Sequence, residues 1–231
     1  MANYISKNII SQAYIHIEIG DLTDEEIEKI RNSIEDFVST RSRFFLNDTI
    51  ESNVEFRTGS LKIYATIMGT LLGLYEGVSK YTDFKASVKE IYSDVHELSD
   101  YISKEIIFIT KAKRDDRIRI ESRTGVIGSL NAIIDKIDTI SSMTGKRNPN
   151  DIAQELKDLS KQINKLISVI KSQEDKELII QGIADISSKI PEKPIPKDEE
   201  KLSALEILAY DDGLKKFYDS LSLYNSSREP F

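Results

Sequence analysis

The chain contains no cysteine and no tryptophan, and each absence excludes a class of chemistry. Without cysteine there can be no disulfide, no thiolate metal site and no cysteine nucleophile. The same absence fits a reducing compartment, so we expect a cytoplasmic protein. The lack of tryptophan weakens the case for an aromatic belt at a membrane interface.

Histidine is also scarce, with only His16 and His96 in the whole sequence. No carboxylate stands at a spacing from either that would make a metal-binding pair. No serine occupies the G-x-S-x-G turn that exposes a hydrolase nucleophile. We therefore expect no catalytic residue, no metal and no cofactor, and a protein that is not an enzyme.

What is present indicates a folded chain with a well-solvated surface. Of the 231 residues, 39% are hydrophobic and 31% are charged, and the net charge is −7. This apolar share and its regular spacing argue against disorder along the whole length. The acidic balance argues against bulk nucleic-acid binding, although a local basic patch is compatible with it. The N-terminal residues lack the basic start and apolar run of a secretory signal.

The N-terminal part shows strand and helix signals close together. Residues 13–19 and 50–56 alternate apolar and polar side chains, which predicts two strands with one buried face each. Between them, Thr23 and Glu26 have the spacing of a capping box and predict a helix from Asp24 to Ser39. We expect a small β-sheet packed with this helix.

A segment from Leu61 to Lys80 carries small residues at strict four-residue intervals, and we interpret it as a helix. Each glycine inside a helix costs about 1 kcal/mol against alanine, so their repetition suggests close approach of another helix. The length also suits a membrane-inserting helix, but Lys62 and Glu76 make it a poor one. We favour a close-packed bundle helix. The interaction candidates on it are Ala65, Gly69, Gly73 and Gly77.

The segment 105–124 fits two structures. Its β-branched residues on either side of a polar turn favour a β-hairpin, while helical spacing of isoleucines allows the preceding helix to continue. A basic cluster lies here, with three acidic residues interspersed. We favour a solvated hairpin tip and keep anion or nucleic-acid contact as the alternative. The arginines of this cluster are Arg114, Arg117, Arg119 and Arg123.

A short pattern, aliphatic-Glu-x-Arg-Thr-Gly, occurs at residues 54–59 and again at residues 120–125. Threonine and glycine at a strand-to-helix turn are typical of simple capping, which is the interpretation we favour. The alternative is an anion site, in which Arg57 and Arg123 bind phosphate beside free backbone N–H groups. The repeat is also compatible with two related strand–helix units, although so short an identity does not establish them.

The C-terminal half predicts helices with apolar stripes. Spacing of 4-3-4 residues begins near Val126 and recurs in the next helix as a coiled-coil-like seam. A further stripe covers 179–190, a proline-rich charged linker covers 191–201, and a short helical tail covers 202–231. The seam supplies further interaction candidates, namely Ile152, Leu156, Leu159, Ile163, Leu166 and Ile170.

Together these patterns predict a predominantly α-helical α+β protein. We expect a small α/β part over 1–59, a helical bundle over 60–190 with a hairpin at 105–124, the linker and the tail. The leading functional hypothesis is a non-enzymatic accessory or scaffold subunit that contacts protein partners, including its own copies. One alternative is a toxin-like effector that inserts residues 61–80 into a membrane. The other is a nucleotide or nucleic-acid sensor that uses Arg57, Arg123 and the basic cluster.

Overall fold

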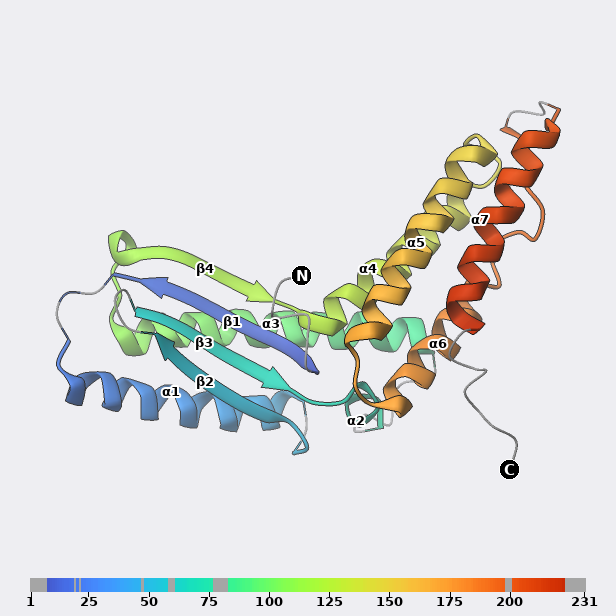
Figure 1. Ribbon diagram of the computed structural model, residues 1–231. Helices are drawn as coiled ribbons and strands as arrows, with labels where there is room; N and C mark the ends of the chain where they lie inside the picture. Colours follow the sequence, from blue (N-terminus) through green and yellow to red (C-terminus); the bar gives the residue numbers. More distant parts are fainter. Residues whose placement is uncertain are drawn as a thin grey trace. The chain divides into compact units, whose positions relative to one another are not determined.

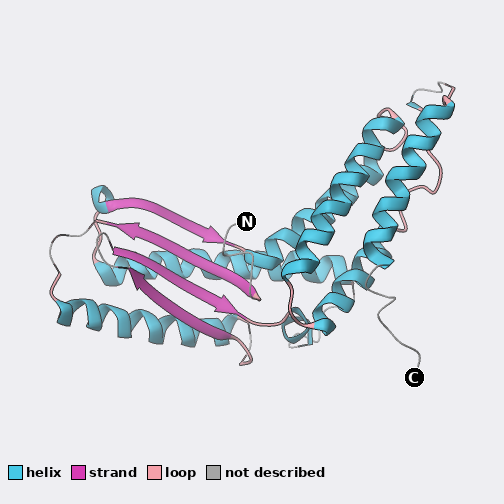
Figure 2. Ribbon diagram, viewed as in Figure 1, coloured by secondary structure: helices cyan, strands magenta, loops and turns pink. Residues whose placement is uncertain are grey.

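The computed structural model describes residues 8–18, 20, 22–46, 48–57, 61–76, 83–197 and 201–222. The chain divides into two compact units, residues 1–129 and residues 130–231. The fold class is predominantly α-helical α+β, as the sequence predicts (Figure 2). The domain boundary expected at residues 59 and 60 lies inside the first unit, between two paired strands of its sheet.

The first unit is a four-stranded antiparallel sheet with helices connecting its strands (Figure 1). The strand order is β2-β3-β1-β4, so each central strand separates two strands that a helix connects. This is a double split β-α-β arrangement. Its elements in chain order are β1 (Ile9–Ile17), α1 (Asp24–Phe45), β2 (Glu51–Arg57), β3 (Leu61–Met68), α2 (Leu71–Glu76), α3 (Phe84–Thr110) and β4 (Arg117–Arg123).

Helices α1 and α3 cover one face of this sheet (Figure 1). On that face Ile15 and Ile63 lie opposite each other on the central strands, and both are fully buried. Two polar contacts join the sheet to α3: the hydroxyls of Ser11 and Ser99 share a hydrogen bond, and Ser122 donates to Asp100. The expected capping box at the start of α1 is confirmed.

The prediction of a helix from Leu61 to Lys80 is wrong. Residues Leu61–Met68 form β3, in which Ile63, Ala65 and Ile67 are buried, and among the described residues of this segment the helical ones are Leu71–Glu76. The β-branched residues of this segment suit a central strand, and pairing on both sides outweighs the small-residue spacing. The regularly spaced small residues therefore belong to different elements: Ala65 lies in β3, Gly69 between β3 and α2, and Gly73 in α2.

The small residues of that segment have separate roles. Gly69 follows β3, and a Cβ there would lie 2.6 Å from Ile50 Cδ1 and 2.8 Å from Ile10 Cδ1. Gly73 lies in the six-residue helix α2, where its N–H donates to the hydroxyl of Thr70. Gly77 lies outside the described residues.

The β-hairpin expected over 105–124 is also wrong, although its second strand is present. Helix α3 continues to Thr110, as the helical alternative predicts, because Ile102 and Ile106 keep their helical spacing and are fully buried. Lys111 then ends the helix in the left-handed region, with φ of 55°. After a 3-10 turn at Arg114–Asp116, β4 pairs with β1 rather than with a neighbouring hairpin strand.

The second unit consists of packed helices, and the sequence predicts most of them. They are α4 (Gly125–Met143, which begins in the first unit), α5 (Pro149–Val169), α6 (Gln173–Ser187) and α7 (Ala204–Ser222). The seam residues of α5 are buried. The helical tail that the sequence predicts is one continuous helix, α7, which packs along α5. Tyr210 of α7 also donates to the carbonyl oxygen of Pro191.

Helices α5 and α7 approach closely at small residues. A Cβ on Gly213 would lie 2.7 Å from the carbonyl oxygen of Ala153. Further along both helices, Ser160 of α5 donates to the carbonyl oxygen of Lys216 of α7 at 2.9 Å. The close helix packing that the sequence suggested for residues 61–80 therefore occurs here.

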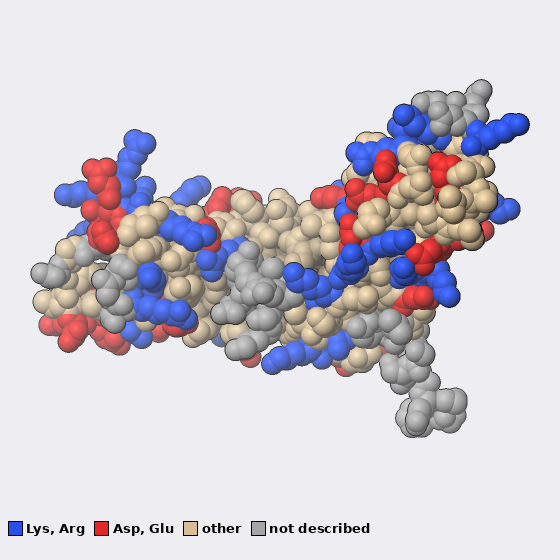
Figure 3. Space-filling model, turned by 45° about the horizontal axis from the view of Figure 1, so that its top comes forward, with Lys and Arg blue, Asp and Glu red and all other residues tan. Residues whose placement is uncertain are grey.

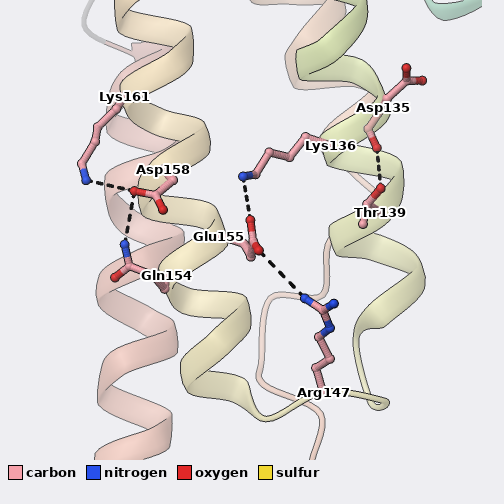
Figure 4. Close-up of polar contacts among 8 residues, drawn as sticks. All are labelled: Asp135, Lys136, Thr139, Arg147, Gln154, Glu155, Asp158 and Lys161. Carbon is pink, nitrogen blue, oxygen red and sulfur yellow. Dashed lines mark hydrogen bonds and ion pairs between the residues drawn. The ribbon is translucent and has the colours of Figure 1, made fainter.

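Ion pairs at the surface accompany this packing. Lys136 of α4 reaches Glu155 of α5 at 2.6 Å, and Arg147 approaches the same carboxylate at 3.9 Å (Figure 4). Lys157 of α5 contacts Asp212 of α7 at 2.8 Å. Exposed pairs of this kind contribute at most about 1 kcal/mol each, so they fix orientation more than they add stability.

We expect Gly213→Ala to destabilise the second unit, because the added methyl group meets backbone that cannot rotate away. Overpacking costs about 1–3 kcal/mol. This exceeds the gain of about 1 kcal/mol from replacing glycine by alanine in a helix. Hydrogen–deuterium exchange should speed up across α5 and α7. Gly20→Ala is the matched control, since no heavy atom lies within 4 Å of its Cβ position. Unchanged exchange in Gly213→Ala would contradict the close approach.

The contact between Asp212 and its two lysines predicts an acid-sensitive junction. Hydrogen bonds from Lys157 and Lys216 lower the pKa of Asp212 to about 2, from an ordinary value of 3.8. A depressed carboxyl pKa stabilises the fold above the ordinary value and loses that contribution as pH falls through about 2. Asp212→Asn should therefore flatten the pH dependence of thermal unfolding between these two values. An unaltered pH profile would show that the pair adds nothing to stability.

Candidate functional site on the open sheet face

The sheet face turned away from α1 and α3, called here the open face, carries a grid of polar and aromatic side chains. The strand registers align them in rows across all four strands. In the middle row, Glu55, Tyr64, Tyr14 and Glu121 lie side by side. The flanking rows are Asn53, Thr66, Gln12 and Arg123 on one side, and Arg57, Lys62, His16 and Arg119 on the other.

Two tyrosines form the centre of the open face. Tyr14 of β1 and Tyr64 of β3 are opposite each other in the register, with ring centroids 4.9 Å apart and planes tilted by 38°. Burial raises the pKa of Tyr14, and the neighbouring Tyr64 raises it further, while Arg119 and Arg123 oppose this. A hydrogen bond with Tyr64 raises the pKa as well, so the Tyr14 phenol is neutral at physiological pH.

An arginine from each edge strand covers one of these rings. The guanidinium of Arg57 lies 4.7 Å from the Tyr64 ring centre, and that of Arg123 lies 4.5 Å from the Tyr14 ring centre. Four groups, guanidinium, ring, ring and guanidinium, thus cross the four strands. Arg119 approaches the Tyr14 ring at 6.0 Å. Tyr14, which these cation–π contacts cover in part, is only 7% exposed.

A glutamate holds each of these arginines two positions away on the same strand. Arg57 Nε donates to Glu55 Oε1 at 2.7 Å, and Arg123 Nε donates to Glu121 Oε2 at 2.6 Å. The bond to Glu55 raises the pKa of Arg57. Burial opposes ionisation of Glu121, but hydrogen bonds from Arg123 and Arg119 lower its pKa overall. Arg57, Arg119 and Arg123 are thus each oriented by a carboxylate, that of Glu55 or of Glu121.

The repeated sequence pattern corresponds to this pairing. Its two copies supply β2 and β4, the two edge strands, and place Glu55 and Arg57 as the counterparts of Glu121 and Arg123. Because β1 and β3 are antiparallel, a local two-fold axis perpendicular to the sheet passes between Tyr14 and Tyr64. The two copies thus take equivalent positions at the edges of the sheet. The expectation that each copy leads into a helix is correct for the second, which precedes α4, and wrong for the first, which precedes strand β3.

The threonine and glycine of the second copy have a structural role. Gly125 adopts φ of 50°, and a Cβ there would lie 2.1 Å from the carbonyl oxygen of Ile9. Only glycine fits so near a neighbouring backbone in this conformation. The carbonyl oxygen of Thr124 accepts the N–H of Gly128, which begins the hydrogen bonding of α4. Thr58 and Gly59 of the first copy lie outside the described residues.

The basic cluster expected at 111–123 is divided by the fold. Arg119 and Arg123 lie on the open face with Arg57. Arg117 instead donates to the carbonyl oxygen of Ala112, and Arg114 belongs to the 3-10 turn. On the face shown in Figure 3, basic and acidic side chains are interspersed in small groups. The sequence therefore identifies three of the arginines of the site and misses both tyrosines.

The interaction candidates occupy other places. Ala65 is fully buried in β3, and all six seam residues of α5 are buried inside the second unit. A different surface is open to contact with a protein partner, namely a groove of about 720 Å³ between α1 and α3. Phe44, which is 77% exposed, Phe45 and Tyr101 line it.

Two other kinds of site find no support in the described part of the chain. Its histidines and carboxylates form no group that could hold a metal ion. None of its helices has the length and apolar character needed to cross a membrane. The membrane-insertion hypothesis also loses its helix, since Leu61–Met68 is a strand.

Comparison with known proteins gives no family, since no family model, curated protein or solved structure matches the chain.

Proposed function

We propose that the protein is a non-enzymatic nucleotide-binding module whose ligand lies across the open face. The observation that carries this proposal is the stack of Arg57, Tyr64, Tyr14 and Arg123 across the four strands. Tyrosine rings and guanidinium planes are the groups on which proteins stack bases that are free of a duplex. A four-stranded sheet with aromatic residues on its central strands is one of the common scaffolds for this contact.

The charges of the open face suit the phosphate groups of such a ligand. Arg57, Lys62, Arg119 and Arg123 bring four cationic side chains, against the three carboxylates of Glu51, Glu55 and Glu121. Arginine can bind phosphate through two parallel N–H donors. Here Arg57 contacts its carboxylate through Nε alone. A nucleotide phosphate can therefore take over an arginine from its glutamate.

Binding on this face requires an exchange of partners. In the free protein each guanidinium lies over a tyrosine ring, so a base reaches the ring only when the arginine moves aside. The base then stacks on the ring, and the released arginine contacts the phosphate. Stacking contributes about 1–3 kcal/mol per base. The contribution of charge is small for a chain of net charge −7, and the affinity should fall only moderately with salt.

Nucleotide binding is preferred here to the scaffold hypothesis for a physical reason. The faces proposed for protein contact, the segment 61–80 and the α5 seam, are used inside the fold. The residues of the nucleotide hypothesis, Arg57 and Arg123, are instead brought to one surface from positions 66 residues apart.

The double substitution Arg57→Ala and Arg123→Ala should weaken nucleotide binding by at least about ten-fold, or 1.4 kcal/mol. It removes both ring-covering cations and both phosphate donors of the stack. Fluorescence anisotropy with labelled single-stranded oligonucleotides, and calorimetry with mononucleotides and dinucleotides, measure the effect. Arg114→Ala is the matched control, because that arginine belongs to the 3-10 turn. Equal losses in the control and the double variant, or no binding by the unmodified chain, would refute the proposal.

A substitution at Tyr64 separates stacking from hydrogen bonding. Tyr64→Phe keeps the ring and should retain most of the affinity, whereas Tyr64→Leu removes it and should lose about 1–3 kcal/mol of binding free energy. Tyr64 is chosen because it is more exposed than Tyr14 and its replacement disturbs the sheet less. Circular dichroism checks that both variants remain folded. The same affinity in all three proteins would show that the ring does not contact the ligand.

A further inference from the structure

The open face presents two similar half-sites, and their local symmetry restricts the ligand. They differ in that Arg119 contacts Tyr14 and Glu121 in one half-site, while Asn53 stands at the corresponding position of the other. One half-site consists of Tyr14 with Glu121 and Arg123, and the other consists of Tyr64 with Glu55 and Arg57. Within each, the guanidinium lies over the ring at a similar distance, 4.5 Å and 4.7 Å, and is held by the glutamate at 2.6 Å and 2.7 Å.

These half-sites are related by rotation and not by translation. Tyr14 and Tyr64 are paired residues on antiparallel central strands, so the axis between them turns one half-site into the other. The same rotation exchanges the edge strands β2 and β4. A ligand that contacts both half-sites in the same way must itself have two halves related by a two-fold axis, as in any symmetric association.

A linear strand does not have this symmetry. Its successive nucleotides run in one 5′-to-3′ direction and are related by a translation with a twist, so a strand crossing the face meets the second half-site in reversed polarity. A cyclic dinucleotide, in which two nucleotides are closed into a ring by two phosphodiester bonds, has the required two-fold axis. It also carries two bases and two anionic phosphates, one of each for every half-site.

We infer that the ligand of the open face is a cyclic dinucleotide, bound with its two-fold axis between Tyr14 and Tyr64. This inference rests on the proposed function and specifies its ligand class. Each base stacks on one tyrosine, and each phosphodiester contacts the arginine of the same half-site. No bond is formed or broken, so the protein acts as a receptor for the molecule.

The two half-sites differ at their borders, and this affects which bases they accept. Gln12 beside Arg123 is the symmetry counterpart of Lys62 beside Arg57. Gln12 already accepts a hydrogen bond from Arg123 at 2.7 Å. An amide side chain suits the edge of adenine, whereas a cation suits the acceptor edge of guanine. The probe panel therefore has to contain ligands with both bases.

Isothermal titration calorimetry of the full chain tests the inference with cyclic di-AMP, cyclic di-GMP and cyclic GMP–AMP. Each is compared with the linear dinucleotides of the same bases and with a single-stranded oligoadenylate. We expect one cyclic ligand per chain, bound at least about ten-fold more tightly than its linear counterpart, since the ring is already closed in the bound geometry. Arg57→Ala and Arg123→Ala should weaken binding by similar factors, and Arg114→Ala should not.

Other outcomes would contradict the ligand class, the joint use of the two half-sites, or nucleotide binding itself. If linear strands bind as tightly as the cyclic ligands, or more tightly with increasing length, the ligand assignment is wrong and the proposed function stands. If only one of Arg57→Ala and Arg123→Ala weakens binding, the two half-sites are not used together and the symmetry argument fails. If no nucleotide of any kind binds, the proposed function itself is wrong.

Discussion

The antiparallel pairing of β1 with β3 determines both sides of the first unit. Its register places Ile15 against Ile63 under the helices and Tyr14 against Tyr64 on the open face. Because side chains alternate along a strand, a shift by one residue would exchange these sets and expose the isoleucines. The same pair carries both edge strands and fixes the local two-fold axis. The core, the tyrosine pair and the arrangement of the arginines therefore depend on this one interaction.

Much of the fold could be predicted from local patterns, and the failures have identifiable causes. The Thr23 capping box and the α5 stripe are local signals, and the structure contains both. The helix prediction for segment 61–68 is wrong because Tyr64 and Met68 lie on the open face of β3, so its hydrophobic residues do not alternate clearly with polar ones. Small residues at four-residue intervals then favoured a helix. Their positions reflect a strand, a turn and a short helix, which only the pairing with β1 and β2 reveals.

The site could be predicted in part for a similar reason. The repeated Glu-x-Arg-Thr-Gly pattern identifies Arg57 and Arg123 as counterparts from the sequence alone, because the pattern consists of adjacent residues. The tyrosines were missed because their relation is tertiary: Tyr14 and Tyr64 are 50 residues apart and meet only through strand pairing. The sequence does carry a weak local signal. Tyr14 in β1 and Tyr64 in β3 each precede an isoleucine by three residues, so the two central strands share a short pattern.

The energies of the contacts explain how one face can be both ordered and ready to bind. A cation–π contact at a surface is worth about 0.5–1 kcal/mol, and an exposed ion pair about 0–1 kcal/mol. Arg57 makes one of each, with Tyr64 and Glu55, so its displacement gives up only two weak contacts. Base stacking at about 1–3 kcal/mol, together with a new arginine–phosphate contact, offsets this. The glutamates therefore keep the arginines oriented without holding them too tightly for exchange, and they favour ligands that supply both a base and an anion.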